Sequence, residues 1–171
     1  RKGVAYFIDA VNHLAAEHPE MKDNTSVAVL GGNAEQVSNE LALPAYPLGY
    51  IADEHKIVSI YNSSDVYVLP SLEDNLPNTI MESMACGVPS VGFRVGGIPE
   101  MIDHRSTGYL ANFKDSSDLA EGIRWVLEDA DSSKLKEACL RKVTRNYSQQ
   151  SVAMKYIEVY NELIALKRYI I

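Results

Sequence analysis

The sequence predicts an α/β domain in which helices cover both faces of a parallel sheet, with a helical tail at the end. Short apolar runs alternate with amphipathic stretches along the chain, and this alternation is typical of parallel strands joined by right-handed crossover helices. The run at residues 65–70 is almost continuously apolar, as in strands buried on both faces. With 171 residues, the chain has the length of one domain. We therefore expect residues 1–171 to form a single domain.

The first helix is predicted at residues 3–17, where apolar side chains recur at helical spacing from Val4 to Ala15. The next elements are a strand ending in Gly31-Gly32, a short helix at 34–42, a strand within 46–50, a helix at 53–63, the strand at 65–70, a helix at 77–86 and a strand at 88–93. They are followed by a short helix near 98–103, a strand near Tyr109, helices at 116–129 and 132–146, and a last helix at 148–168.

Composition excludes several classes of function. A net charge of −7 argues against a nucleic-acid partner. The four histidines show no metal-ligand spacing, and the chain has no G-x-G-x-x-G or P-loop motif. We therefore expect no metal and no cofactor. Asp129-Ala130-Asp131 falls between two predicted helices, which indicates a helix boundary with a cap.

Residues 70–100 carry the most informative polar side chains. Asp74 follows the strand that ends at Pro70, and Glu73 precedes it directly. Pro77 fits the first turn of the next helix. A diphosphate could lie on the free amides at this helix start, because the helix dipole favours an anion there. On spacing alone, both carboxylates could equally be residues that favour a helix N-terminus.

The same helix is predicted to have one polar face, formed by Asn75, Asn78 or Thr79, and Glu82. Glu82 lies about two turns into the helix, within reach of the ribose of a nucleotide. The competing interpretation is that Glu82 is an ordinary surface charge.

The wording around these residues, Pro-Ser-Leu-Glu-Asp-Asn-Leu-Pro-Asn and Met-Glu-Ser-Met-Ala-Cys-Gly-Val-Pro, resembles the donor-nucleotide site of retaining glycosyltransferases of the GT-B fold. This is the large family built on a Glu-x7-Glu pattern. The resemblance implies a Rossmann-like parallel sheet sandwiched by helices, forming one half of a GT-B fold. It also implies that Glu82 holds the donor ribose and that Asp74, or Glu73 in its place, contacts the donor sugar. Residues implied to meet the sugar and diphosphate are Asn75, Leu76, Asn78 and Thr79.

Further candidates come from the same resemblance. Lys2 matches the lysine of the family's Lys-Gly step, which pairs with the donor diphosphate, and Arg1 assists it. Gly31, Gly96 and Gly97 end predicted strands, where tight turns alone would also explain a glycine. The sequence segment 95–100 is similar to the family's loop beside the donor pocket. Tyr50 matches a stretch that faces the nucleotide base, although a structural role is equally compatible with it.

The resemblance implies that the chain is the donor-binding half of a hexosyltransferase, a retaining, metal-independent enzyme that uses a nucleoside diphosphate sugar. The amino-terminal acceptor domain and the first strand of this domain would be absent, and 148–171 would be the helix that crosses back. The acceptor would be a glycan or a lipid-linked molecule of bacterial polysaccharide or glycolipid synthesis. The fragment alone would be inactive, and the parent enzyme cytoplasmic or membrane-peripheral at the inner face of the cell membrane. The alternatives are a non-catalytic nucleotide-sugar-binding or interaction domain, and an epimerase or phosphorylase of the same architecture.

Overall fold

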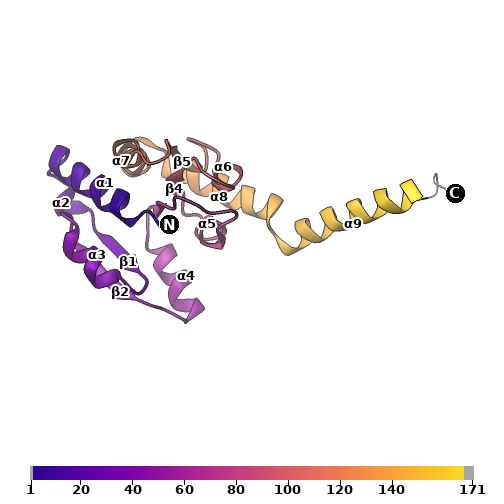
Figure 1. Cartoon of the computed structure of the whole chain (residues 1–171), viewed down its shortest axis with the longest axis horizontal. Helices are drawn as coiled ribbons and strands as arrows, with labels where there is room; N and C mark the ends of the chain where they lie inside the picture. The colour runs from indigo at the N-terminus through magenta and orange to yellow at the C-terminus, as the bar shows by residue number, and fades with distance from the viewer. Residues whose placement is uncertain (1, 168–171) are drawn as a thin grey trace.

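The structure, a computed structural model, describes residues 2–167 (Figure 1). Arg1 and residues 168–171, which include the end of the predicted last helix, lie outside the described residues. In chain order, the elements are α1 (Val4–Glu17), α2 (Met21–Asn24), β1 (Val27–Leu30), α3 (Ala34–Glu40), β2 (Ala45–Gly49), α4 (Glu54–Asn62), β3 (Tyr67–Leu69), α5 (Asn78–Ala85), β4 (Ser90–Phe93), α6 (Ile98–Met101), β5 (Gly108–Ala111), α7 (Ser116–Arg124), a π-helical turn η1 (Trp125–Asp129), α8 (Ser132–Asn146) and α9 (Gln149–Lys167). The predicted order of strands and helices is confirmed.

The strands form two parallel sheets. β1 pairs with β2, while β3, β4 and β5 form a second sheet in that order. Within the described residues, β1 and β3 are each hydrogen-bonded to a strand on one side only. Among residues 2–167, no ladder joins β1 to β3. The parallel sheet structure flanked by helices is as expected, and it is divided into two parts.

The core surrounds the three-stranded sheet. β4 is buried along its whole length, with helices on both sides. On one face, Val91 and Phe93 pack in a cluster with α1 and α7, to which Leu14 and Leu119 belong. On the other face, α5 and α6 contribute apolar side chains, and Cys139 of α8 joins them. The layered α/β architecture expected from the sequence is thus present around β3–β5.

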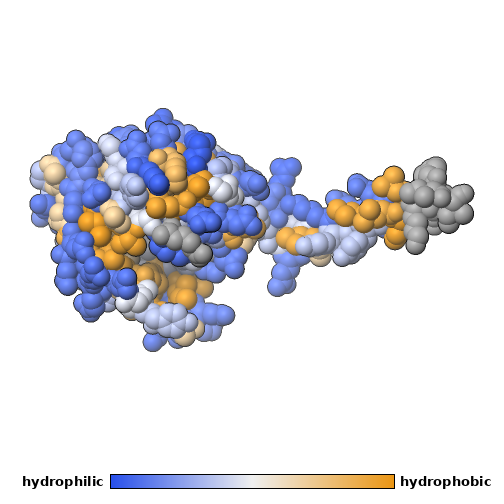
Figure 2. All heavy atoms as spheres, in the orientation of Figure 1, coloured by the Kyte–Doolittle hydropathy of each residue, from blue (hydrophilic) through white to orange (hydrophobic). Residues whose placement is uncertain are grey.

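The last helix leaves the body. In Figure 1, α9 extends away from the sheets as an isolated arm, and it contacts the rest of the chain mainly through α8. Figure 2 shows apolar side chains along this arm, and Tyr156, Val159, Tyr160 and Leu163 are all about half exposed or more. Within residues 2–167, no helix combines the length and the apolar composition needed to cross a bilayer. These side chains of α9 therefore do not pack against the body of the domain.

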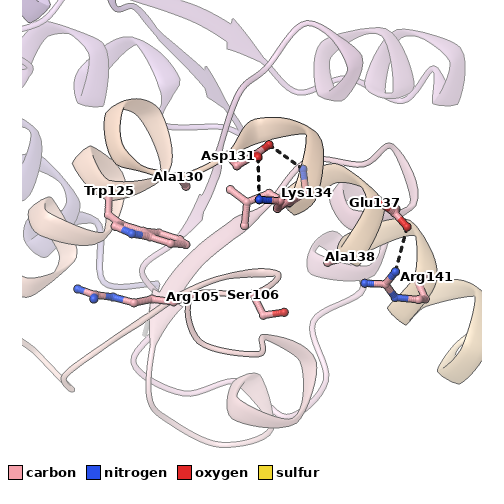
Figure 3. Close-up of a pocket in the computed structure, with 10 residues that line it drawn as sticks. Arg105, Ser106, Trp125, Ala130, Asp131, Lys134, Glu137, Ala138 and Arg141 are labelled. Carbon is pink, nitrogen blue, oxygen red and sulfur yellow. Dashed lines mark hydrogen bonds and ion pairs between the residues drawn. The ribbon is translucent and has the colours of Figure 1, made fainter.

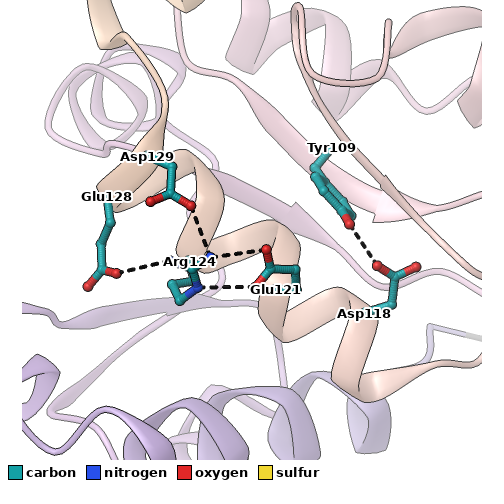
Figure 4. A network of polar contacts seen from close by, with 6 residues as sticks. All are labelled: Tyr109, Asp118, Glu121, Arg124, Glu128 and Asp129. Carbon is teal, nitrogen blue, oxygen red and sulfur yellow. Dashed lines mark hydrogen bonds and ion pairs between the residues drawn. The ribbon is translucent and has the colours of Figure 1, made fainter.

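Two local features differ from the predicted elements. The short helix α2 was not predicted, and the helix expected at 116–129 changes to a π-helical turn after Arg124. This turn brings Asp129 within 2.9 Å of the Arg124 guanidinium, which also pairs with Glu121 and Glu128 (Figure 4). The predicted cap is confirmed, because the Asp131 side chain accepts the Lys134 amide at the start of α8.

Candidate functional site

The candidate site is built on α5 and on the loop that joins it to β3. Ile80 and Met84 are completely buried, so they fix one side of α5 against the core. The opposite side carries Asn78 and Glu82, which are exposed, and Thr79, which is half-buried. The predicted polar face is confirmed for Asn78 and Glu82, whereas Asn75 lies in the loop before α5.

The amide groups at the start of α5 have no side-chain cap. Its N-cap residue is Pro77, which makes no capping hydrogen bond. In contrast, α4, α7 and α8 are each capped by an aspartate, and these are Asp53, Asp115 and Asp131. The Ile80 amide donates to the Pro77 carbonyl oxygen at 3.1 Å. The Asn78 and Thr79 amides are therefore the ones available to an external acceptor at the positive end of the helix dipole.

Asp74 lies at the centre of the polar contacts in the preceding loop. Its Oδ2 atom is 3.9 Å from the Lys2 ammonium and accepts a hydrogen bond of 3.4 Å from the buried hydroxyl of Ser71. The Asp74 side chain is 21% exposed, and that of Lys2 is 63% exposed. The structure thus brings together a cation, a carboxylate and a helix N-terminus, which can bind a ligand that carries both a diphosphate and hydroxyl groups.

Glycines hold this loop through backbone contacts. A Cβ atom added at Gly97 would lie 1.6 Å from the carbonyl oxygen of Asn75, and one added at Gly96 would lie 1.9 Å from that of Asp74. The Gly97 amide also donates to the Asp74 carbonyl, at 3.2 Å. A Cβ atom added at Gly3 would likewise overlap the Pro70 carbonyl oxygen at the end of β3. These glycines place Lys2, Asp74 and the start of α6 next to one another.

Glu82 has a tyrosine neighbour that the sequence did not indicate. The Tyr61 hydroxyl lies 3.5 Å from Oε2 of Glu82 and 3.4 Å from the Thr79 carbonyl oxygen. Burial, then the neighbouring Tyr67 and Glu82, raise the pKa of Tyr61. Burial and Glu82 likewise raise the pKa of the Cys86 thiol. Both groups are therefore neutral beside the Glu82 carboxylate.

The other predicted residues are placed as follows. Glu73 and Asn75 are exposed, and Leu76 is 45% exposed. Gly31 and Tyr50 follow β1 and β2 of the separate two-stranded sheet, where Tyr50 is 85% exposed. Among the described residues, no polar contact joins either of them to the Asp74 cluster.

A cavity of about 340 Å³ lies elsewhere, between the loop that precedes β5 and the start of α8 (Figure 3). Arg105 and Trp125 form one wall. Its other charged groups pair with each other, Lys134 with Asp131 and Arg141 with Glu137. The cavity contains none of the predicted site residues. Within residues 2–167, no group of three or more His, Cys, Asp or Glu side chains could hold a metal ion.

Sequence reasoning missed Tyr61 and Ser71. Each contributes a hydroxyl that touches a predicted carboxylate, and neither belongs to a polar pattern. Ser71 follows Pro70 in the quoted motif, so its place in that motif was an available signal. Tyr61 lies one helix upstream, and only the fold brings its hydroxyl to Glu82.

A known protein family matches the part of the chain that contains the candidate site. The family described as glycosyl transferases group 1 matches residues 1–129. The N-acetyl-alpha-D-glucosaminyl L-malate synthase of Bacillus anthracis is 28% identical over 116 residues, which are 67% of this chain and 30% of that protein. An N,N'-diacetylbacillosaminyl-diphospho-undecaprenol alpha-1,3-N-acetylgalactosaminyltransferase of Campylobacter jejuni is 27% identical over 168 residues, 95% of this chain and 42% of that protein.

Among solved structures, the Anabaena protein HepE in complex with UDP-glucose matches with a TM-score of 0.75 and 20% identity, over 94% of this chain and 45% of HepE. The fold is therefore that of GT-B glycosyltransferase structures. The chain spans less than half the length of these relatives. Because the family match covers most of the chain, the chain belongs to the glycosyl transferases group 1 family.

Proposed function

We propose that this chain is the donor-binding, carboxyl-terminal half of a hexosyltransferase that uses a nucleoside diphosphate sugar. The observation that carries the proposal is the contact between Lys2 and Asp74 in the loop that leads to the uncapped start of α5. A diphosphate leaving group gains negative charge during glycosyl transfer. An ammonium group and oriented amides are suited to stabilise that charge without a metal.

In this proposal the two carboxylates bind different parts of the donor. Glu82 lies two turns from the start of α5 and is exposed, so its oxygens can accept hydrogen bonds from the ribose hydroxyls. Asp74 accepts from the donor sugar. No enzymatic nucleophile is assigned, and the proposed reaction proceeds with retention of configuration at the anomeric carbon through positioning and leaving-group stabilisation.

The remaining parts of the enzyme would complete the fold. The carboxyl end of β3 lies against Gly3. In this proposal the first strand would lead to Gly3 and pair in parallel with the edge of β3 that has no neighbour among the described residues. The exposed apolar side chains of α9 would pack on the acceptor domain. Amide exchange tests the strand, because the β1 and β3 edges should exchange rapidly in this chain and slowly in the longer protein.

The acceptor is proposed to be a glycan or a lipid-linked molecule of bacterial polysaccharide or glycolipid synthesis. The relative from Campylobacter jejuni has a diphospho-undecaprenol acceptor in its name, which supports this class. An acceptor in a bilayer would place the enzyme in the cytoplasm at the inner face of the membrane.

Calorimetric titration with UDP, GDP and ADP tests the proposal and identifies the base. Glu82→Ala should weaken binding of the preferred diphosphate about 10- to 100-fold, since it removes hydrogen bonds to a charged acceptor. Glu137→Ala is the matched control, because this exposed glutamate lines the separate cavity, and it should bind like wild type. The proposal would be contradicted if the wild-type chain bound none of the three diphosphates. It would also be contradicted if wild type and Glu82→Ala bound the preferred diphosphate equally well.

A non-catalytic interaction domain is the second candidate, and the exposed apolar arm α9 is the observation that favours it. Such a domain would not need a nucleotide site. Glu82→Ala would then have no effect on any ligand.

A further inference from the structure

Tyr61 occupies a fixed position at the last turn of α4. Its ring is buried, with 9% of the residue exposed, and it packs edge-on against Tyr67 of β3, with ring centroids 5.7 Å apart and planes at 80°. The helix that carries it begins after Asp53, whose side chain accepts the His55 amide at 3.0 Å. The hydroxyl at the tip of the ring therefore has little freedom of position.

That hydroxyl points at α5, one turn after its start. It lies 3.4 Å from the Thr79 carbonyl oxygen and 3.5 Å from Oε2 of Glu82. Its single proton has two acceptors, and the ionised carboxylate is the stronger one. Among the described residues, Glu82 makes no ion pair, and the Tyr61 hydroxyl is the donor that contacts its carboxylate.

An exposed glutamate side chain samples several rotamers, and ordering it on binding costs free energy. A donor held by the core restricts the carboxylate before the ligand arrives, so part of that cost is met by folding.

We infer that Tyr61 is a positioning residue whose buried hydroxyl orients the Glu82 carboxylate for the ribose hydroxyls of the donor. The inference deepens the proposed function and rests on it for the identity of the ligand. The contact between Tyr61 and Glu82 can be tested without any ligand. The raised pKa of Tyr61 keeps the hydroxyl protonated, as a donor requires.

The first experiment compares ribose-containing and 2′,3′-dideoxy forms of the diphosphate that wild type prefers. Tyr61→Phe should weaken binding of the ribose form about three- to tenfold and leave binding of the dideoxy form unchanged. With Glu82→Ala, which removes the acceptor, the added effect of Tyr61→Phe should disappear, since the two act through one contact. Tyr147→Phe is the matched control, because it removes a hydroxyl that donates to the Glu100 carbonyl at 3.3 Å, and it should bind both forms like wild type. Equal loss of both forms in Tyr61→Phe would overturn the inference.

The second experiment needs no nucleotide. In the free chain, three-bond couplings of the Glu82 methylene protons should report one dominant rotamer in wild type and an average over rotamers in Tyr61→Phe. Averaged couplings in wild type, or unchanged couplings in Tyr61→Phe, would refute the positioning role. If wild type bound no nucleoside diphosphate, the proposed function would fail, while these couplings would still decide the role of Tyr61.

Discussion

The contact between Gly97 and the acidic loop gives the sharpest prediction about this site. Gly97 has a φ of −89°, a backbone conformation open to any residue, so Gly97→Ala introduces no dihedral strain. Its effect comes only from the added Cβ atom, which would lie 1.6 Å from the Asn75 oxygen and 2.8 Å from the Asn75 carbonyl carbon. Because both neighbours are backbone atoms, no rotation of a side chain relieves the overlap.

The magnitude follows from how far the two segments must separate. Ordinary contact between a carbon and an oxygen atom requires the Cβ and the Asn75 oxygen to move apart by roughly 2 Å. A shift of this size would also break the hydrogen bond from the Gly97 amide to the Asp74 carbonyl. Overpacking costs about 1–3 kcal/mol, which for a domain of this length lowers the melting temperature by roughly 3–10 °C.

Urea unfolding followed by circular dichroism measures this loss. Gly32→Ala is the matched control, because a Cβ atom at Gly32 meets nothing within 4 Å. The control should leave the free energy of unfolding unchanged or raise it by up to about 1 kcal/mol. If Gly97→Ala unfolded at the same urea concentration as wild type, with an equal m-value, the proposed close contact between Gly97 and the Asp74 loop would be refuted.

Three further predictions concern other residues. Asp74→Asn should weaken binding of a nucleoside diphosphate sugar more than Glu73→Gln in calorimetry, because Asp74 is the carboxylate in contact with an ammonium and a buried hydroxyl; the reverse order would assign the role to Glu73. Burial and neighbouring guanidinium groups lower the pKa of His104 from 6.5, and its Nδ1 accepts the Leu110 amide. The neutral ring therefore stabilises the fold above pH 6.5, and the free energy of unfolding should fall as the pH drops from 6.5 toward the folded-state pKa. His104→Gln should lose this pH dependence. An equal change of unfolding free energy with pH in both proteins would contradict the prediction. Asp131→Ala should lower the free energy of unfolding measured in urea, because it removes the cap of α8; an unchanged midpoint would show that the cap contributes nothing.

The elements that sequence predicted best are those fixed by burial on one side. The spacing from Val4 to Ala15 predicted α1, whose buried residues include Val11 and Leu14. The apolar run before Pro70 predicted β3, and the polar face of α5 was predicted because buried Ile80 leaves only one side of that helix for solvent. Periodicity reports such one-sided burial directly.

The division into two sheets could not be read from periodicity. Strand propensity in β1 and β3 depends on their own side chains, whereas pairing depends on which strand lies beside each of them. A crossover helix fixes the handedness of a connection but leaves the neighbour undetermined. The π-helical turn after Arg124 escaped prediction for a similar reason. The Arg124 guanidinium pairs with Glu121, Glu128 and Asp129, but the wider turn that brings Asp129 to it leaves no pattern in the sequence.

Space around the candidate glycines separates two roles that the sequence could not distinguish. A Cβ atom added at Gly31 would meet no atom within 4 Å, whereas one added at Gly96 or Gly97 would overlap backbone oxygens of the acidic loop. Open space at the end of β1 is compatible with close approach of a ligand. The glycine pair after β4 instead allows two protein segments to touch, and so sets the position of Asp74 relative to Lys2. Substitutions in this pair should therefore affect a ligand by displacing Asp74. Gly97→Ala and Asp74→Asn should both weaken binding of the donor sugar through one shared contact, so the loss in the double variant should be less than the sum of the two single losses.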